Sequence, residues 1–272
     1  MDPLTAELAN VERALEQNLW ALWMRFGRGA GCVLHNEPDA LWFETPIPTL
    51  PYNAVLRHTS EYGVDRSIDR IFETYRVRGV PFVWLIHPSA APADLAAKLR
   101  ARGLVEVETV EGMWLDLSLL SPVPPPPAGI QIREVETDAD REAFIDLVAW
   151  RWEVPGEFVP TLREISGSFG IGAPGSSIRG WIAWKDGLPV SKVLLNQAAG
   201  AAGIYAVATR PEARGQGLAR RLTLAALDAA RENGHQLAVL HATPMSVDLY
   251  AKLGFRSFAP FHVYAQPGNF HL

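Results

Sequence analysis

Hydrophobic and polar positions alternate along this chain in patterns that predict helices and strands. Five leucine and valine residues recur at helical spacing near the start, which predicts an amphipathic helix from Leu4 to Trp23. Short apolar runs predict strands at 40–44, 52–56, 80–87 and 112–117. Periodic runs between them predict helices at 67–77 and 93–102. The first 120 residues therefore contain enough elements for a domain.

A second series of elements follows. The pattern predicts strands at 129–135, 179–184, 189–195, 203–208, 236–242 and 261–265, and helices from Thr137, over 157–165 and up to Asn233. The segment Ser121-Pro122-Val123-Pro124-Pro125-Pro126-Pro127-Ala128-Gly129 lies between the two series. Its prolines exclude a helix or a central strand and favour an extended spacer. We therefore expect two domains, 1–120 and 130–272, joined by a proline-rich linker at 121–129.

Composition excludes several classes of protein. The chain is 48% hydrophobic with a net charge of −5 and no basic run, which argues against a nucleic-acid partner. The single cysteine, Cys32, excludes an internal disulfide framework and fits a reducing compartment. Met1-Asp2-Pro3-Leu4 lacks the basic start of a signal peptide, and no apolar run reaches the roughly 20 residues of a membrane span. We expect a soluble, cytoplasmic protein without a membrane partner, and a homodimer is left open.

The stretch Arg214-Gly215-Gln216-Gly217-Leu218-Ala219 joins a predicted strand to a long predicted helix. The first backbone N–H groups of a helix lack internal partners, and the helix dipole adds partial positive charge there. Glycines at this point keep Cβ atoms away, so an anion can bind directly to the amides. No Lys-Ser or Lys-Thr follows, which excludes a P-loop, and Arg220 stands where a dinucleotide-binding turn has its third glycine. The pattern predicts a pyrophosphate site.

The next predicted strand leads to Ser246-Val247-Asp248-Leu249-Tyr250-Ala251-Lys252-Leu253-Gly254-Phe255. In their order and separation, the glycine loop and this segment resemble the two motifs of the GNAT acyltransferases, over about the second half of the chain. The resemblance implies an α/β (α+β) fold with a mixed, mostly antiparallel central sheet flanked by helices. It also implies an acetyl-CoA-dependent N-acetyltransferase that acts on a small-molecule or peptide amine, with no metal.

The same resemblance implies roles for individual residues. Backbone groups of Val207, Ala208 and Thr209 would pair with the pantetheine arm of acetyl-CoA. Arg214 would lie at the rim of the pyrophosphate site, whose amides would come from Gly215, Gln216, Gly217, Leu218 and Ala219. Tyr250 would donate a proton to the leaving thiolate, because a phenol with a pKa near 10 is protonated at neutral pH. The alternative interpretation is that Tyr250 packs its helix on the sheet.

A general base is harder to place. GNAT enzymes often carry a glutamate on the central strand, but Ile204-Tyr205-Ala206-Val207-Ala208 contains no carboxylate. Glu153, Glu157 and His241 are substitutes, and each also has a structural interpretation, as a solvated helix-terminus charge or a strand-end histidine. Trp152 and neighbouring aromatic residues either line an acceptor pocket or pack helices on the sheet. An amine of low pKa needs no dedicated base, and none is assigned.

The two series of elements share a short repeat. Asp94–Leu99 matches Asp248–Leu253 at five of six positions, and His87 and His241 are separated by the same 154 positions. The repeat predicts a tandem protein whose first domain is a degenerate GNAT-like copy. In that copy Ala96 replaces the tyrosine, and His58–Arg66 carries two carboxylates where an anion site needs glycines. We therefore expect no acyl-CoA binding in the first domain.

Two functions remain open at this point. The first is an N-acetyltransferase with a single active C-terminal domain. The second is a non-catalytic acyl-CoA-binding or protein-interaction module on a GNAT scaffold. The glycine loop fits both, Tyr250 favours catalysis, and the missing strand carboxylate keeps the second function open.

Overall fold

The computed structural model describes residues 3–268, which form two compact units that exchange segments of chain. Unit 1 comprises the chain up to Leu22, Glu111–Pro155 and Phe169–Phe258. Unit 2 comprises Trp23–Val110, Gly156–Ser168 and the chain from Ala259 onward. These units differ from a division at residues 121–129, because the proline-rich segment lies within unit 1. Met1, Asp2 and residues 269–272 of the two predicted domains lie outside the described residues.

The sheet of unit 1 has the strand order β5-β10-β9-β8-β7-β6. Its strands are β5 (Val105–Asp116), β6 (Ile130–Glu134), β7 (Ile178–Lys185), β8 (Leu188–Ala198), β9 (Ala201–Thr209) and β10 (Leu237–Ala242). Neighbours are antiparallel except β9 and β10, which are parallel. The parallel pair requires a crossover, and the helix between these strands supplies it.

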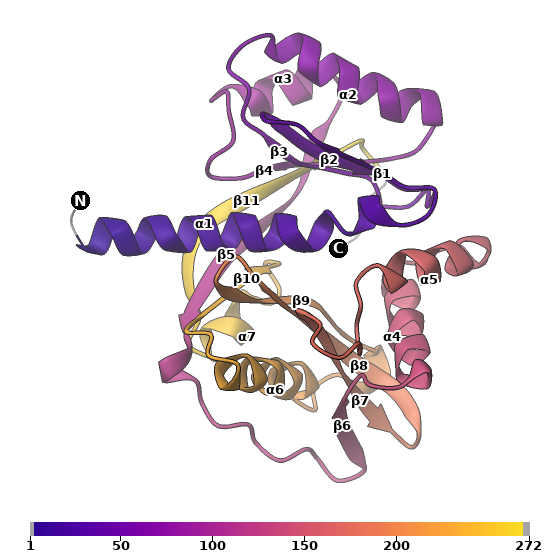
Figure 1. The fold of residues 1–272 in the computed structure, drawn as a ribbon, viewed down its shortest axis with the longest axis vertical. Coiled ribbons are helices and arrows are strands. Elements are labelled where there is room, and N and C mark those ends of the chain that lie inside the picture. The colour runs from indigo at the N-terminus through magenta and orange to yellow at the C-terminus, as the bar shows by residue number, and fades with distance from the viewer. Residues whose placement is uncertain (1–2, 269–272) are drawn as a thin grey trace. The chain divides into compact units, whose positions relative to one another are not determined.

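Helices cover both faces of this sheet (Figure 1). They are α4 (Asp138–Arg151), α6 (Leu218–Glu232) and the short α7 (Val247–Ala251), with the 3₁₀ turns η2 (Leu117–Leu119) and η4 (Pro211–Ala213). Successive residues of a strand point to opposite faces. Val193 and Leu195 share a buried cluster with the core face of α6, whereas Lys192 lies over the ring of Phe144 on α4. Thus α4 and α6 pack on opposite faces.

The first helix, α1 (Pro3–Trp23), belongs to unit 1 up to Leu22 because Asn18 attaches it to the sheet. The Asn18 side-chain amide donates hydrogen bonds to the carbonyl oxygens of Asn196, Ala198 and Ala201, at 3.2, 2.8 and 3.0 Å. Its Oδ1 accepts one from the Tyr205 hydroxyl at 3.0 Å. The side chain is fully buried, so these bonds satisfy an amide that would otherwise be costly to bury.

Unit 2 contains a sheet of order β1-β2-β3-β4-β11-β5. Its further strands are β1 (Val33–Asn36), β2 (Ala40–Glu44), β3 (Ala54–His58), β4 (Val83–Ile86) and β11 (Arg256–Ala265). Its helices are α2 (Val64–Arg78), α3 (Leu95–Ala101) and α5 (Val159–Gly167), with the turns η1 (Phe26–Arg28) and η3 (Gly156–Phe158). Trp42, Tyr75, Phe82 and Trp84 lie in its core.

The predicted fold class is confirmed, since each unit is a mixed, mostly antiparallel sheet flanked by helices. Strands β5 and β11 begin well before their predicted starts, at Val105 and at Arg256. Each passes from one unit into the other along the chain. The short strand β1 was not predicted, because its four residues, two apolar and two polar and none of them buried, form no apolar run.

The two units repeat one structural motif. Helices α2 and α6 each contain 15 residues, and each begins after a left-handed glycine, Gly63 (φ 61°) or Gly217 (φ 70°). These glycines are separated by the same 154 positions as the sequence repeat. In each unit, the strand before this helix is parallel to the strand after it, β3 with β4 and β9 with β10. This repetition fits the tandem arrangement predicted from sequence.

Candidate functional site

Strand β9 stops pairing with β10 midway along its length. Their parallel register ends at Ile204 and Leu240, although β9 continues to Thr209. Beyond Ile204 the described structure pairs β9 with β8 alone. The predicted pantetheine-binding residues Val207, Ala208 and Thr209 all lie in this stretch. A free strand edge of this kind can accept an extended ligand as an added strand.

A left-handed residue marks the point of divergence. Ala206 has φ 52°, and the register of β8 against β9 shifts beside it, between Lys192 and Leu194. Such a conformation is unfavourable for a residue with a Cβ atom, and extra residues in a ladder bend the strand. Two of the other left-handed residues that are not glycine, Asp186 and Ala199, lie in hairpin turns, where this conformation is expected. Ala206 has no such explanation and sits in a strand.

The glycine loop follows β9 and leads into α6. Gly215 (φ 74°) and Gly217 (φ 70°) are both left-handed and exposed, and the space around the missing Cβ of Gly215 is open. No side chain caps the N-terminus of α6. Leu218 is buried in the core and Ala219 is half-buried, so they anchor the helix start while its amides remain available. An uncapped N-terminus flanked by glycines is suited to a pyrophosphate.

Two arginines brace this loop. The Arg214 Nε donates to the carbonyl oxygen of Thr209 at 3.2 Å, which links the loop back to the end of β9. The Arg221 Nη1 donates to the carbonyl oxygens of Gln216 and Gly217 at 2.9 and 3.2 Å. Its Nε donates to the carbonyl oxygen of Pro125 at 2.9 Å, so the proline-rich segment is held against the same helix.

Lys192 on β8 holds the part of β9 that no longer pairs with β10. Its side chain is fully buried, and Nζ donates to the carbonyl oxygen of Ala206 at 2.6 Å. Burial, and then the charge of Arg151, lowers the pKa of Lys192 to about 7. The neighbouring Ser191 hydroxyl donates to the carbonyl oxygen of Ala208 at 2.8 Å. Side chains of β8 thus hold two carbonyl groups of β9 where β10 no longer pairs.

Tyr250 lies on α7 with its ring against Phe255, at a centroid distance of 5.9 Å. The residue is buried, and burial raises its pKa, so the phenol is protonated throughout the neutral range. Among residues 3–268 no hydrogen bond is made by its hydroxyl. The ring therefore packs as the structural interpretation expected, while its hydroxyl keeps the proton that a catalytic role requires.

The three candidates for a general base lie in different surroundings. His241 stacks on Tyr205 at 6.2 Å, and burial lowers its pKa to about 3, so it is neutral at physiological pH. Glu153 is exposed directly after α4, with φ 48° and its N–H bonded to the carbonyl oxygen of Trp150. This is the left-handed position that ends many helices, and it is usually a glycine. Glu157 is exposed in η3 of unit 2.

Trp152 is the residue directly after α4, and its ring is covered by a cation. The guanidinium of Arg151 lies 4.9 Å from the centroid of Trp152, and that of Arg210 lies 4.9 Å from Trp150. Both tryptophans are half-buried. These aromatic side chains therefore pack against arginines.

Within residues 3–268 no group of three or more His, Cys, Asp or Glu side chains is placed to hold a metal ion. Within the same residues no helix has the length and apolar character to span a membrane.

Comparison with known proteins gives a family match over the part of the chain that contains the candidate site. Residues 186–258, which include the divergent strands, the glycine loop and Tyr250, match the acetyltransferase (GNAT) domain family. This part of the chain is thus similar to a GNAT acetyltransferase domain. Members of this family use acetyl-CoA. The match begins at the turn between β7 and β8 and ends in β11, so the core of the GNAT domain lies in unit 1.

Curated relatives of this chain include mycothiol acetyltransferases. The enzyme of Thermobispora bispora is 30% identical over 193 residues, covering 61% of this chain and 60% of the relative. That of Saccharomonospora viridis is 29% identical over 196 residues, covering 66% of this chain and 62% of the relative. The chain thus spans about 60% of the length of these relatives.

Solved structures show the same fold. A GCN5-related N-acetyltransferase from Kribbella flavida superposes with a TM-score of 0.66 at 19% identity, covering 92% of this chain and 94% of the other. A tandem GNAT protein from the clavulanic acid biosynthesis pathway superposes with a TM-score of 0.60 at 18% identity, covering 87% and 83%. These matches extend over both GNAT-like units.

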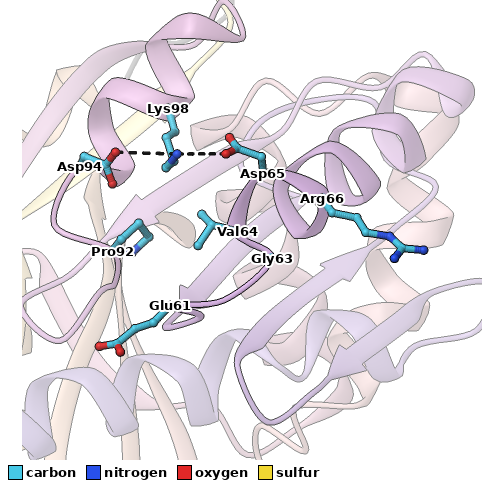
Figure 2. Close-up of a pocket in the computed structure, with 8 residues that line it drawn as sticks. All are labelled: Glu61, Gly63, Val64, Asp65, Arg66, Pro92, Asp94 and Lys98. Carbon is cyan, nitrogen blue, oxygen red and sulfur yellow. Dashed lines mark hydrogen bonds and ion pairs between the residues drawn. The ribbon is translucent and has the colours of Figure 1, made fainter.

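The corresponding place in unit 2 is built differently. A cavity of about 480 Å³ lies at the N-terminus of α2, where Asp65 takes the position of Ala219 in the repeat. Lys98 Nζ lies 3.1 Å from Asp65 and 3.7 Å from Asp94, and Figure 2 shows it between the two carboxylates. Hydrogen bonds from Arg102 and Lys98 lower the pKa of Asp65, so a carboxylate is present at this helix start.

The sequence did not indicate that Lys192 and Arg151 belong to the candidate site. The one available signal for Lys192 is a charged residue within the apolar run Val190–Leu195. That signal indicates a buried lysine without indicating its partner. Arg151 stands between two tryptophans at a helix end, a pattern that sequence alone does not separate from a solvated helix terminus.

Proposed function

We propose that this chain transfers the acetyl group of acetyl-CoA to an amine acceptor by direct attack, in the domain at residues 130–272. Two adjoining features support the proposal, the divergence of β9 from β10 and the uncapped N-terminus of α6 immediately after it. A ligand with an extended polar arm and a pyrophosphate fits both. The mycothiol acetyltransferase relatives favour a small molecule as the acceptor.

The residues present fit acetyl-CoA, which supplies an acetyl group activated as a thioester. Backbone groups of Val207, Ala208 and Thr209 would bind the pantetheine arm along the free edge of β9. The amides from Gly215 to Ala219 would hold the pyrophosphate, with Arg214 at the rim. Gly215 and Gly217 have the left-handed conformation and exposed backbone that such close contact requires.

Tyr250 would return a proton to the thiolate that leaves. Its raised pKa keeps the proton on the phenol across the working range, and its hydroxyl has no partner among the described residues that would compete. We assign no general base. His241 is a poor choice, because with a pKa of about 3 its ring scarcely binds a proton near neutral pH. An acceptor amine of low pKa would arrive already deprotonated.

The test combines binding and turnover on the full chain. Calorimetric titration with acetyl-CoA should show one site per chain, and an amine panel should reveal release of free CoA. Tyr250→Phe should keep the affinity for acetyl-CoA and lower kcat by about 10²–10⁴-fold, which is the range for loss of a general acid. Unchanged turnover in this variant would remove Tyr250 from the reaction.

A non-catalytic acyl-CoA-binding module is the second candidate, because β9 contains no carboxylate. The two functions separate in one experiment. A module binds acetyl-CoA with normal affinity and acetylates no amine in the panel, and Tyr250→Phe then changes nothing that can be measured. An enzyme shows turnover that the same substitution lowers.

A further inference from the structure

Three arginines of unit 1 gather at the end of β9 and form what we call the arginine cluster, Arg151, Arg210 and Arg214. Arg151 is the last residue of α4, Arg210 directly follows β9, and Arg214 opens the glycine loop. Burial and then the charge of Arg214 lower the pKa of Arg151, whose own charge acts on Lys192. The charges of Arg214 and Arg151 therefore lie close enough to repel each other.

None of the three is neutralised. Among residues 3–268, no carboxylate lies within ion-pair distance of Arg151, Arg210 or Arg214. Glu153 acts on Arg151 only as the weakest of the influences on its pKa. Other arginines of unit 1 do have carboxylate partners, as in the two 2.6 Å bonds from Arg179 to Glu134. Unpaired like charges repel, and binding of an anion relieves that repulsion.

The guanidinium groups of Arg151 and Arg210 are also held in place. Each lies 4.9 Å from the ring centroid of a tryptophan, Trp152 and Trp150 respectively, on the last turn of α4. The Arg210 Nε further donates to the carbonyl oxygen of Pro189 at 3.3 Å. Contact with an aromatic face restricts a planar guanidinium and leaves its edge free, which favours bidentate recognition of carboxylate or phosphate.

Two anions could satisfy the cluster, a phosphate of CoA or a group on the acceptor. The glycine loop and the start of α6 already offer amides for the pyrophosphate, with Arg214 beside them. Arg151 acts from α4, which packs on the face of the sheet opposite α6. An anion that reaches Arg151 and Arg210 therefore approaches from the α4 face, separate from the amides of the loop.

We propose that the amine acceptor carries a carboxylate or phosphate group and that Arg151 and Arg210 bind it. This inference rests on the proposed acetyl transfer and adds the chemical class of the acceptor. Arg214 then lies beside the pyrophosphate of CoA, while Arg151 and Arg210 determine which acceptor binds. The amine and the anionic group of such an acceptor are parts of one molecule, so binding of the anion positions the amine.

The test uses matched acceptors that differ in one anionic group, such as glucosamine 6-phosphate against glucosamine and 4-aminobutyrate against butylamine. At fixed ionic strength, the wild-type chain should favour the anionic member in kcat/KM by at least about tenfold, the factor expected for one charge-assisted hydrogen bond. Arg151→Gln and Arg210→Gln should each remove that preference through KM while leaving the Kd for acetyl-CoA unchanged.

Arg133→Gln is the matched control. Arg133 also lies over a tryptophan, 4.5 Å from the Trp184 centroid, but is paired with Asp140 at 3.2 Å. Its loss changes the net charge by the same amount and should leave the preference intact. Equal use of charged and neutral acceptors by the wild-type chain would overturn the inference. Weaker acetyl-CoA binding in Arg151→Gln, with the acceptor preference kept, would assign the cluster to CoA instead.

A binding measurement separates failure of this inference from failure of acetyl transfer. The wild-type chain, saturated with CoA so that the CoA phosphate sites are filled, is titrated with inorganic phosphate by calorimetry. Saturable millimolar binding that Arg151→Gln abolishes supports an anion site even if no amine in the panel is acetylated. Absence of phosphate binding in the CoA-saturated chain would count against the site.

Discussion

Gly203 on β9 leaves open the space that the side chain of Asn18 on α1 occupies. A Cβ atom on Gly203 would overlap Asn18 Oδ1 and would come within 2.5 Å of the Tyr205 ring. Both neighbours are fixed, because Asn18 makes its hydrogen bonds to β8 and β9 and the Tyr205 hydroxyl donates to Asn18. The first helix is therefore fixed against β9 at Gly203, one residue before the pairing of β9 with β10 ends at Ile204. This contact explains why the start of the chain belongs to unit 1.

Gly203→Ala should lower the free energy of unfolding by about 2–3 kcal/mol, because overpacking and a lost buried hydrogen bond act together. Denaturant unfolding measures the change. Gly156→Ala is the control, since its added Cβ meets nothing within 4 Å. It should change stability by less than about 0.5 kcal/mol.

A double-mutant cycle checks the cause of that loss. Asn18→Ala removes the side chain that a Cβ on Gly203 would strike, so the cost of Gly203→Ala should fall in the Asn18→Ala background. Additive costs would show that the overlap with Asn18 is not what excludes alanine at position 203.

Lys192 should make stability depend on pH. Its pKa is about 7 in the folded protein and 10.5 in the unfolded chain, so between these values the unfolded state binds a proton that the folded state does not. Stability from this residue therefore rises with pH from about 7 toward 10.5, with a slope of up to about 1.4 kcal/mol per pH unit. Below pH 7 the lysine is charged in both states and its contribution is constant and lowest.

Lys192→Met should flatten that rise. Unfolding in denaturant at pH 6, 7, 8 and 9 compares the variant with the wild-type chain, and the difference between them should change only above about pH 7. Lys185→Met is the control, because Lys185 is half-buried at the end of β7 and should leave the slope alone. Parallel curves for the wild type and Lys192→Met would mean that Lys192 is charged in the folded protein across this range.

Glu153→Gly should stabilise the protein by about 0.5–1 kcal/mol, because glycine adopts the left-handed conformation at the end of α4 without steric cost. Glu153→Gln keeps the backbone strain and removes the charge, so it should leave stability nearly unchanged. If Glu153 is only a helix-terminus charge, both variants retain turnover. A loss of kcat in both would show that its carboxylate takes part in the reaction.

Local patterns were sufficient for much of the fold and for the glycine loop. Apolar periodicity predicts α2, with a start three residues late at Ser67, and also α6 and the strands between them. The glycines at 215 and 217 signal a turn into a helix. Exchange of segments between the units depends on contacts between residues far apart in sequence, such as those of Asn18 with Asn196 and Ala201. No local pattern carries that information.

The finer features of the candidate site also depend on tertiary structure. Alanine has no sequence signature for a left-handed conformation, so the bend at Ala206 was not predictable. The partner of Lys192 is a backbone carbonyl, which leaves no trace in the sequence. The absence of counter-ions around Arg151 is likewise a property of the packed chain, because glutamates occur nearby in the sequence without reaching it.

The two left-handed helix starts allow a matched test of which unit binds acetyl-CoA. Gly217→Glu and Gly63→Glu place the same side chain at equivalent positions, φ 70° before α6 and φ 61° before α2, so the backbone cost should be similar, about 1–2 kcal/mol. A Cβ atom at position 217 would also come within 2.6 Å of Arg221 Nη1, the end of a flexible side chain that must shift, whereas one at position 63 meets nothing within 4 Å. In the full chain, calorimetry should show one site for the wild type, one for Gly63→Glu and none for Gly217→Glu. The added carboxylate repels a pyrophosphate only where one binds. In unit 2 the carboxylate of Asp65 already lies at the start of α2.

Thermal melts with similar midpoints would show that both variants are folded. Normal affinity in Gly217→Glu would contradict the site at the start of α6, and loss of affinity in Gly63→Glu alone would move it to unit 2.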